Sequence, residues 1–158
     1  MAPQLTILAP MAGVVRALGA VDDQVFAAGL VGPGCAILPE SGESGESGES
    51  AALSPVPGVL AAVHPHAFVV QSGARGVLVH LGIDTVRLRG AGFTALLEAG
   101  AAVRAGDPVL RWDAAAVVRA GLSALCPVVA VQAASGAVRW LVREGDRVAP
   151  GDPVLEWR

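Results

Sequence analysis

Two histidines on either side of a glycine-rich turn are the residues of this chain best suited to chemistry. His66 precedes the turn at residues 72–76, and His80 follows it inside the apolar stretch Val79-His80-Leu81-Gly82-Ile83. A neutral imidazole nitrogen is a nucleophile near pH 7, and a second imidazole can steady a charged group held on the first. The pair therefore suits a reaction in which one ring attacks and the other stabilises the group transferred.

The turn also predicts how the two histidines are placed. If it is centred on Gly73, antiparallel strands place residues equidistant from Gly73 opposite each other. His66 then faces His80 across a hairpin, with Cβ atoms about 5 Å apart. Two imidazoles this close are rarely needed for folding, so the spacing indicates a functional site.

The same register divides the apolar side chains of the hairpin between two faces, because side chains alternate along a strand. The histidine face is expected to carry Phe68, Val70 and Leu78. The core face is expected to carry Ala67, Val69, Val77, Val79 and Leu81. An apolar face that the core does not require indicates a partner surface. In the alternative interpretation both faces are buried in a sandwich, and the histidines are hydrogen-bonded core residues.

The elements that must position this hairpin are short strands joined by glycine and proline turns. The segment Gly100–Trp112 recurs as Gly145–Trp157, each time with the pattern Gly-Asp-Pro-Val-Leu-x-Trp. A fainter echo relates Pro10-x-x-Gly13-Val14 to Pro55-x-x-Gly58-Val59. Such repeats predict duplicated β-units around one core, in an all-β antiparallel sandwich. One short helical segment is expected at Ala114–Ala120, capped by Asp113.

Composition narrows the class of protein. The chain has 158 residues, the length of one domain, and 53% of them are hydrophobic. No run approaches the ~20 apolar residues that a membrane-spanning helix needs, and the start carries no signal pattern, so no direct membrane insertion is expected. Cys35 and Cys126 are most simply buried thiols in a reducing compartment, which favours the cytoplasm. Without a basic cluster and with 4% aromatic residues, nucleic-acid binding is not expected.

A low-complexity tract interrupts the chain. Residues 41–50 repeat Ser-Gly-Glu, a composition that cannot bury apolar surface. We expect a disordered insertion at about residues 40–52, and a tolerated repeat expansion explains it better than an interaction tail, since longer loops cost little closure entropy.

Longer motifs carry a resemblance. They are His66-Ala67-Phe68 and Val79-His80-Leu81-Gly82-Ile83-Asp84-Thr85-Val86, with Gly106-Asp107-Pro108-Val109 and Pro127-Val128-Val129 further on. On these residues the chain resembles the glucose-type enzyme IIA of the bacterial sugar phosphotransferase system. The resemblance covers nearly the whole chain, apart from Glu40 to Ala52. It implies a flattened β-sandwich with internal duplication, in a single type-1 EIIA domain over residues 1–158.

The resemblance also implies the chemistry. His80 would accept a phosphoryl group from the histidine-containing phosphocarrier protein and pass it to the IIB domain of a glucose- or N-acetylglucosamine-type sugar permease. One nitrogen of His80 would carry the phosphate while the other is bound to a backbone carbonyl. His66 would donate to the phosphoryl group. Neither a metal nor a cofactor is implied, because the phosphate travels attached to protein.

Partner contacts are implied as well. Asp23 and Asp84 would flank the site and attract an arginine of the donor. An apolar ring would dock donor and acceptor in turn, and its expected members are Val25, Phe26, Phe68, Leu78 and Val86. A small apolar surface with a charged rim suits transient complexes. In the alternative interpretation, Asp84 is a turn or cap residue after a strand and Asp23 is a turn aspartate.

Two further points stay open in the sequence. His64 stands where the family commonly carries a threonine that hydrogen-bonds the second histidine, so it either orients His66 or lies on the rim. His64-Pro65-His66 and His80-x-x-x-Asp84 also resemble the zinc ligands of certain cell-wall endopeptidases on a related fold, although the order of the two motifs is reversed here. A lysine-attached prosthetic group, as in biotinyl or lipoyl carriers, is excluded because the chain has no lysine.

Overall fold

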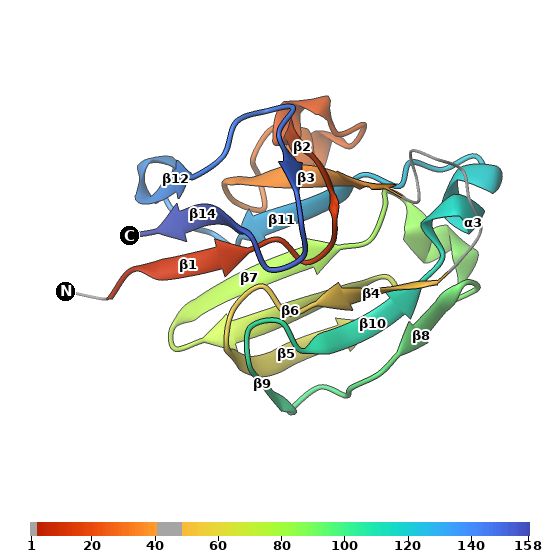
Figure 1. Ribbon diagram of the computed structural model, residues 1–158, viewed down its shortest axis with the longest axis horizontal. Coiled ribbons are helices and arrows are strands. Elements are labelled where there is room, and N and C mark those ends of the chain that lie inside the picture. The colour runs from red at the N-terminus through yellow and green to blue at the C-terminus, as the bar shows by residue number, and fades with distance from the viewer. Residues whose placement is uncertain (1–2, 41–48) are drawn as a thin grey trace.

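The computed structural model describes residues 3–40 and 49–158, and their regular secondary structure consists mainly of antiparallel strands (Figure 1). An eight-stranded sheet forms one layer. Its strands, in spatial order, are β13 (Arg147–Val148), β2 (Gly13–Ala17), β3 (Gly34–Pro39), β11 (Cys126–Ala130), β7 (Arg75–His80), β6 (Ala67–Ser72), β5 (Gly58–His64) and β9 (Ala102–Val103).

Two three-stranded sheets complete the sandwich. One has the order β1 (Leu5–Leu8), β14 (Pro153–Trp157) and β12 (Val138–Trp140). The other has the order β4 (Ser50–Leu53), β10 (Pro108–Trp112) and β8 (Phe93–Ala95). In Figure 1 β1 lies beside β14, and β4 lies beside β10, as their pairing requires. The predicted all-β antiparallel sandwich is confirmed.

Helical structure is short among the described residues. It consists of α1 (Gln24–Ala27), α3 (Ala114–Arg119) and the 3₁₀ turns η1 (Leu18–Ala20), η2 (Thr85–Leu88) and η3 (Ser135–Ala137). The predicted helix at Ala114–Ala120 is confirmed to within one residue. The Asp113 carboxylate accepts a hydrogen bond from the Ala116 N–H at 3.1 Å, as an N-cap does. No helix in the described part of the chain is long and apolar enough to cross a membrane.

The internal duplication is visible in the strand pairing. Gly13 pairs with Val148 in one unit, and Gly58 pairs with Val103 in the other. The small sheets repeat the relation, because Ile7 pairs with Leu155 as Ala52 pairs with Leu110. The two halves of the large sheet therefore have equivalent strand pairing at their outer ends, and β11 and β7 are neighbours at the centre of the sheet. The duplication that the repeated Gly-Asp-Pro segments predict is confirmed.

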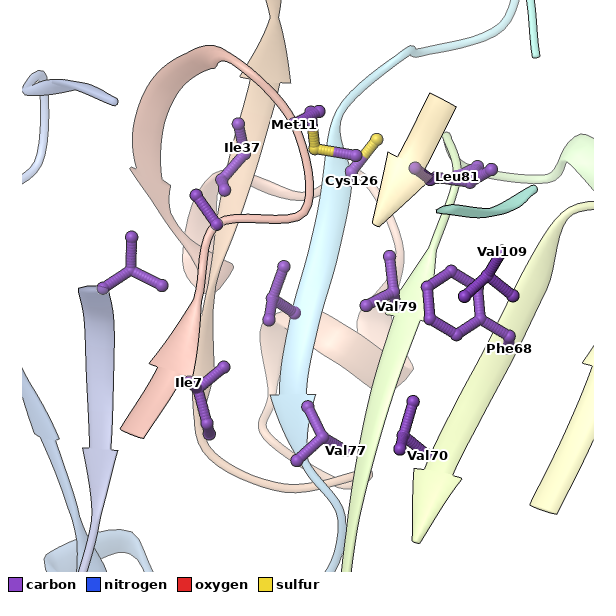
Figure 2. Close-up of a cluster of buried hydrophobic side chains, with 14 of the residues drawn as sticks. Ile7, Met11, Ile37, Phe68, Val70, Val77, Val79, Leu81, Val109 and Cys126 are labelled. Carbon is purple, nitrogen blue, oxygen red and sulfur yellow. The ribbon is translucent and has the colours of Figure 1, made fainter. Parts of the chain in front are cut away.

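The main core lies between the large sheet and the two small sheets (Figure 2). The large sheet contributes Val70, Val77 and Val79, and the small sheets contribute Ile7 and Val109, all with 0% exposure. A second, smaller cluster covers the opposite face of the large sheet. Its members are Leu18, Val21, Phe26, Ala36, Ile83, Leu125 and Val129, with Leu78 packed against them. Both faces of the central strands are thus partly covered. The second cluster includes Phe26, whose ring packs against His80.

The register of the β6–β7 hairpin differs from the prediction by one residue. The turn has two central residues, Gly73 and Ala74, between the pair Ser72 and Arg75. Gly73 adopts φ +61°, the left-handed conformation that a two-residue hairpin turn of type II′ has at its first central position. His80 therefore faces Ala67 rather than His66.

A one-residue slip moves every side chain of a strand to the other face. Phe68 and Val70 face the main core at 0% exposure, so the prediction that they share the histidine face is wrong. Ala67 and Val69, expected in the core, lie on the face of His80 and Leu78 instead. The expected placement of Leu78 on the histidine face and of Val77, Val79 and Leu81 in the core is confirmed.

Most of the low-complexity tract, residues 41–48, lies outside the described residues. Its expected end at residue 52 is wrong, because residues 50–53 form strand β4. Ala52 pairs with Leu110 and is 0% exposed, so burial in the core holds this segment in the sheet.

Candidate functional site

His80 ends the central strand β7, and its ring is held by the chain that follows. Its Nδ1 lies 2.6 Å from the carbonyl oxygen of Gly82. Because a carbonyl can only accept, Nδ1 carries the proton and donates it, which leaves the lone pair of a neutral ring on Nε2. Gly82 has φ +77°, and a Cβ there would lie 2.7 Å from Thr85 Cγ2. Glycine at this position therefore permits the turn that brings the carbonyl under the ring.

His66 reaches His80 from a different element. It lies in the two-residue turn between β5 and β6, where His64 pairs with Ala67. The N–H of Leu81 donates to the carbonyl oxygen of His66 at 2.7 Å, which ties this turn to the end of β7. The centroids of the His66 and His80 rings are 5.1 Å apart, at an interplanar angle of 71°. The predicted proximity of the two histidines is confirmed, although the predicted ladder pairing is wrong.

An aromatic ring and two carboxylates surround the pair. The ring of Phe26 packs edge-on against His80, with centroids 5.3 Å apart. Asp23 caps the helix of Phe26, since its carboxylate accepts from the Val25 N–H at 2.9 Å. Asp84 has φ +59° and its side chain makes no cap hydrogen bond, unlike that of Asp23. Asp84 is therefore a turn residue whose side chain does not cap, and Asp23 is a helix cap rather than the simple turn aspartate of the alternative interpretation.

The electrostatics favour neutral rings in both histidines. Burial lowers the pKa of His80, and it outweighs the hydrogen bond to Gly82 and the carboxylates of Asp23 and Asp84, which raise it. Burial also lowers the pKa of His66, and the neighbouring His80 and His64 lower it further. At pH 7 both rings are neutral, so His80 offers a free lone pair and His66 a neutral N–H donor.

These directions predict a pH dependence for any reaction at His80. The Nε2 lone pair exists only in the neutral ring, so the single-turnover rate of attack should fall as the pH drops, with a midpoint below the ordinary value of 6.5. Because the unfolded chain binds this proton at a higher pH than the folded chain, the free energy of unfolding should also decrease on acidification below pH 6.5. NMR titration of the His80 ring measures the midpoint directly, and a midpoint above 6.5 would contradict the burial argument.

The surface around the histidines carries exposed apolar side chains. Val25 is 48% exposed and Val86 is 61% exposed, whereas Phe26 is 7% exposed and supports the surface from below. Phe68 cannot contribute to a docking surface, because its side chain is 0% exposed in the main core. The expectation that it lines the docking ring is therefore wrong.

Sequence reasoning missed Leu30, which is 73% exposed. Its N–H donates to the carbonyl oxygen of Val25 at 3.0 Å, so it follows the same helix as Val25 and Phe26. The signal available in the sequence was a large apolar residue directly after a glycine, Gly29-Leu30. In the structure Gly29 adopts φ +71°.

Two cysteines are the other reactive groups, and the thiol of Cys126 lies beside the backbone of Gly82, the residue that holds the His80 ring. Cys35 and Cys126 are free and buried, and burial raises the pKa of each thiol to about 12. Within residues 3–40 and 49–158, no three His, Cys, Asp or Glu side chains are grouped so as to hold a metal ion. His64, His66 and Asp84 do not form a zinc centre with His80 in this arrangement.

A duplicated β-sandwich that sets two neutral histidines together, one of them with a free Nε2 lone pair, suits a protein that carries a transferable group. The family model described as the phosphoenolpyruvate-dependent sugar phosphotransferase system, EIIA 1, matches residues 5–136. The chain belongs to this family, and it is a phosphotransferase component of sugar transport. The resemblance read from the histidine motifs is confirmed.

Known relatives support this family assignment. The beta-glucoside-specific EIIBCA component of Bacillus subtilis is 39% identical over 127 residues, which are 78% of this chain and 19% of that protein. The glucose-specific EIIA component of Oceanobacillus iheyensis is 34% identical over 129 residues, which are 80% of this chain and 73% of that protein. The chain thus spans about a fifth of the fused relative and most of the separate one.

The fold matches a solved structure. The glucose permease IIA from Mycoplasma capricolum superimposes with a TM-score of 0.84 at 31% sequence identity, covering 98% of this chain and 96% of that chain. The relatives described here are all sugar phosphotransferase components, and none favours the zinc-hydrolase alternative.

Proposed function

We propose that His80 accepts a phosphoryl group from the histidine-containing phosphocarrier protein and delivers it to the IIB domain of a glucose- or N-acetylglucosamine-type sugar permease. One observation carries the assignment to His80. Its Nδ1 donates to the Gly82 carbonyl at 2.6 Å, so Nε2 is the free nucleophilic nitrogen, next to a second neutral histidine. A metal is not needed, because the group moves between protein side chains.

In the proposed transfer one P–N bond forms as another breaks. The Nε2 lone pair of His80 forms the new P–N bond while the P–N bond of the donor phosphohistidine breaks, and that electron pair returns to the donor ring. The proton on Nδ1 stays in its hydrogen bond to Gly82. His66 is placed to donate an N–H to a phosphoryl oxygen, where charge accumulates. The reverse sequence delivers the group to the acceptor.

Docking is proposed to use the surface around the histidines. Val25, Leu30 and Val86 supply its exposed apolar area, over Phe26 and Leu78. The carboxylates of Asp23 and Asp84, which act on His80, form an acidic rim suited to an arginine of the donor. Fused relatives that combine EIIA with other components of the system support a IIB domain as the acceptor. We further infer that the protein is cytoplasmic, because such partners and reduced cysteines are found in the cytoplasm. We also infer that residues 1–158 form one domain.

The docking surface predicts a specific kinetic defect. Replacing Val25 and Val86 together by serine should raise the KM for the phosphorylated donor about tenfold and leave kcat unchanged, because apolar contact is lost while the histidines keep their geometry. Val59→Ser is the matched control, since Val59 is 46% exposed at the other end of β5 from His64. Equal KM values for the double variant and the control would place the docking surface elsewhere.

The proposed function is tested by intact-mass spectrometry of the domain after incubation with phosphoenolpyruvate, enzyme I and the phosphocarrier protein. An acid-labile gain of one phosphoryl group supports the proposal. If both carriers are shown to be active and no gain occurs, the proposal is wrong.

A further inference from the structure

His64 is an ionisable residue beside the site for which the proposed relay gives no task. It is the last residue of β5, and it is exposed. Its ring centroid lies 6.0 Å from that of His66, at an interplanar angle of 32°, and the His66 ring lies 5.1 Å from that of His80. Three imidazoles therefore form a row that begins at the rim with His64 and ends at the nucleophile.

Among the described residues, the half-buried ring of His66 has ring contacts but no hydrogen bond to fix its orientation. The backbone of His66 is fixed by the Leu81 N–H, but its imidazole projects from a two-residue turn. In the described part of the chain, this imidazole contacts the rings of His64 and His80 and makes no hydrogen bond of its own. A donor for a phosphoryl oxygen must be held in a narrow range of orientations, since misplacement of about 1 Å can cost about 10²-fold in rate.

We propose that His64 is a positioning residue of the relay, whose imidazole packs against the ring of His66 and keeps it directed at His80. This inference rests on the proposed function and adds a residue to it. His64 pairs with Ala67 in the β5–β6 ladder, so its Cα is fixed on the far side of the turn that carries His66. It is well placed to limit the rotation of that ring.

A positive charge on His64 would also favour the neutral form of the His66 ring. When the His64 imidazole is protonated it repels a second positive charge on His66, and this contributes to the lowered pKa of His66. The other group that lowers the pKa of His66 is His80, while Asp23 and Asp84 act on His80. A neutral His66 stabilises a phosphoryl group by one hydrogen bond rather than by an ion pair. The group can then leave for the acceptor.

The experiment compares His64→Ala and His64→Thr with the wild-type domain. After phosphorylation, unphosphorylated phosphocarrier protein is added and the back-transfer of the phosphoryl group from His80 is followed across the pH range 5.5–8, a range of about one unit or more on each side of imidazole titration. NMR signals of the His66 ring are titrated in parallel. Val59→Ala, on the same strand, is the control.

His64→Ala should slow back-transfer about tenfold, by loss of ring orientation. It should also raise the pKa of His66, because a neighbouring imidazole that repels a positive charge on His66 is removed. His64→Thr should recover the rate, because its hydroxyl can hydrogen-bond the ring, but should keep the raised pKa, because it has no charge.

The outcomes separate this inference from the proposed function. If the wild-type domain accepts no phosphate, the relay itself is wrong and this inference fails with it. If the wild-type domain accepts phosphate and both His64 variants match it in rate, pH profile and His66 titration, His64 is only a rim residue while the relay stands. A rate loss without any change in His66 signals relative to Val59→Ala would also overturn the positioning role.

Discussion

His80→Gln is expected to abolish phosphorylation of this domain. The substitution removes the Nε2 lone pair on which the P–N bond is proposed to form. Glutamine retains an N–H donor that can reach the Gly82 carbonyl, so the turn after β7 should survive. We therefore expect an unchanged thermal unfolding midpoint together with complete loss of the acid-labile mass gain that the wild-type domain shows with phosphoenolpyruvate, enzyme I and the phosphocarrier protein.

One control variant and a check of the folded state make this result interpretable. Val59→Ser, with its exposed position on β5, should accept phosphate as the wild-type domain does. Retention of the mass gain in His80→Gln would assign the nucleophile to another residue, and peptide mapping would then distinguish His66 from His64. Loss of the gain together with loss of the folded state would point to the part-buried Nδ1–Gly82 hydrogen bond as a folding contact. Solution spectra of the variant settle this question first.

The proximity of the histidines was predictable because it depends only on the position of the turn. Gly73 sets the turn to within one residue, and either register brings His66 and His80 near each other. Which side chains face the site was not predictable in the same way, because it depends on whether the turn has an odd or an even number of residues. Phe68 shows the effect: the predicted register is one residue off, so Phe68 was expected on the docking surface but lies in the core.

The surface around the histidines was harder to derive for a different reason. Asp23, Val25 and Phe26 lie far from His80 in the sequence, and a short helix brings them to it only because the second hydrophobic cluster covers that face of the large sheet. A four-residue helix has no periodicity to detect, and its one signal is the capping carboxylate of Asp23. By contrast, the repeated Gly-Asp-Pro units and the Asp113 cap were predictable, because each is specified by residues adjacent in the chain.

His66→Gln is expected to separate acceptance from delivery. The nucleophile and its Gly82 hydrogen bond remain, so His80 should still take up one phosphoryl group. The amide N–H of glutamine lies on a flexible chain without the ring contacts to His64 and His80, so the donor proposed to act on the phosphoryl oxygens is no longer held in place. Removing one such donor typically costs about 10²- to 10³-fold in rate. We therefore expect a phosphorylated variant that transfers its group to a IIB domain at least about a hundredfold more slowly.

The measurement is a single-turnover transfer from the isolated phosphorylated domain, in which acceptance has already taken place. Acceptance and delivery would be affected equally if His66 acted only as a packing partner of His80, since their rings are 5.1 Å apart and a packing defect would disturb the nucleophile in both directions. A selective loss of delivery requires instead that His66 acts on the phosphoryl group itself. The ratio of the two rates in His66→Gln, compared with that in the wild-type domain, therefore decides whether the second histidine is a donor in the transfer or a support for the first.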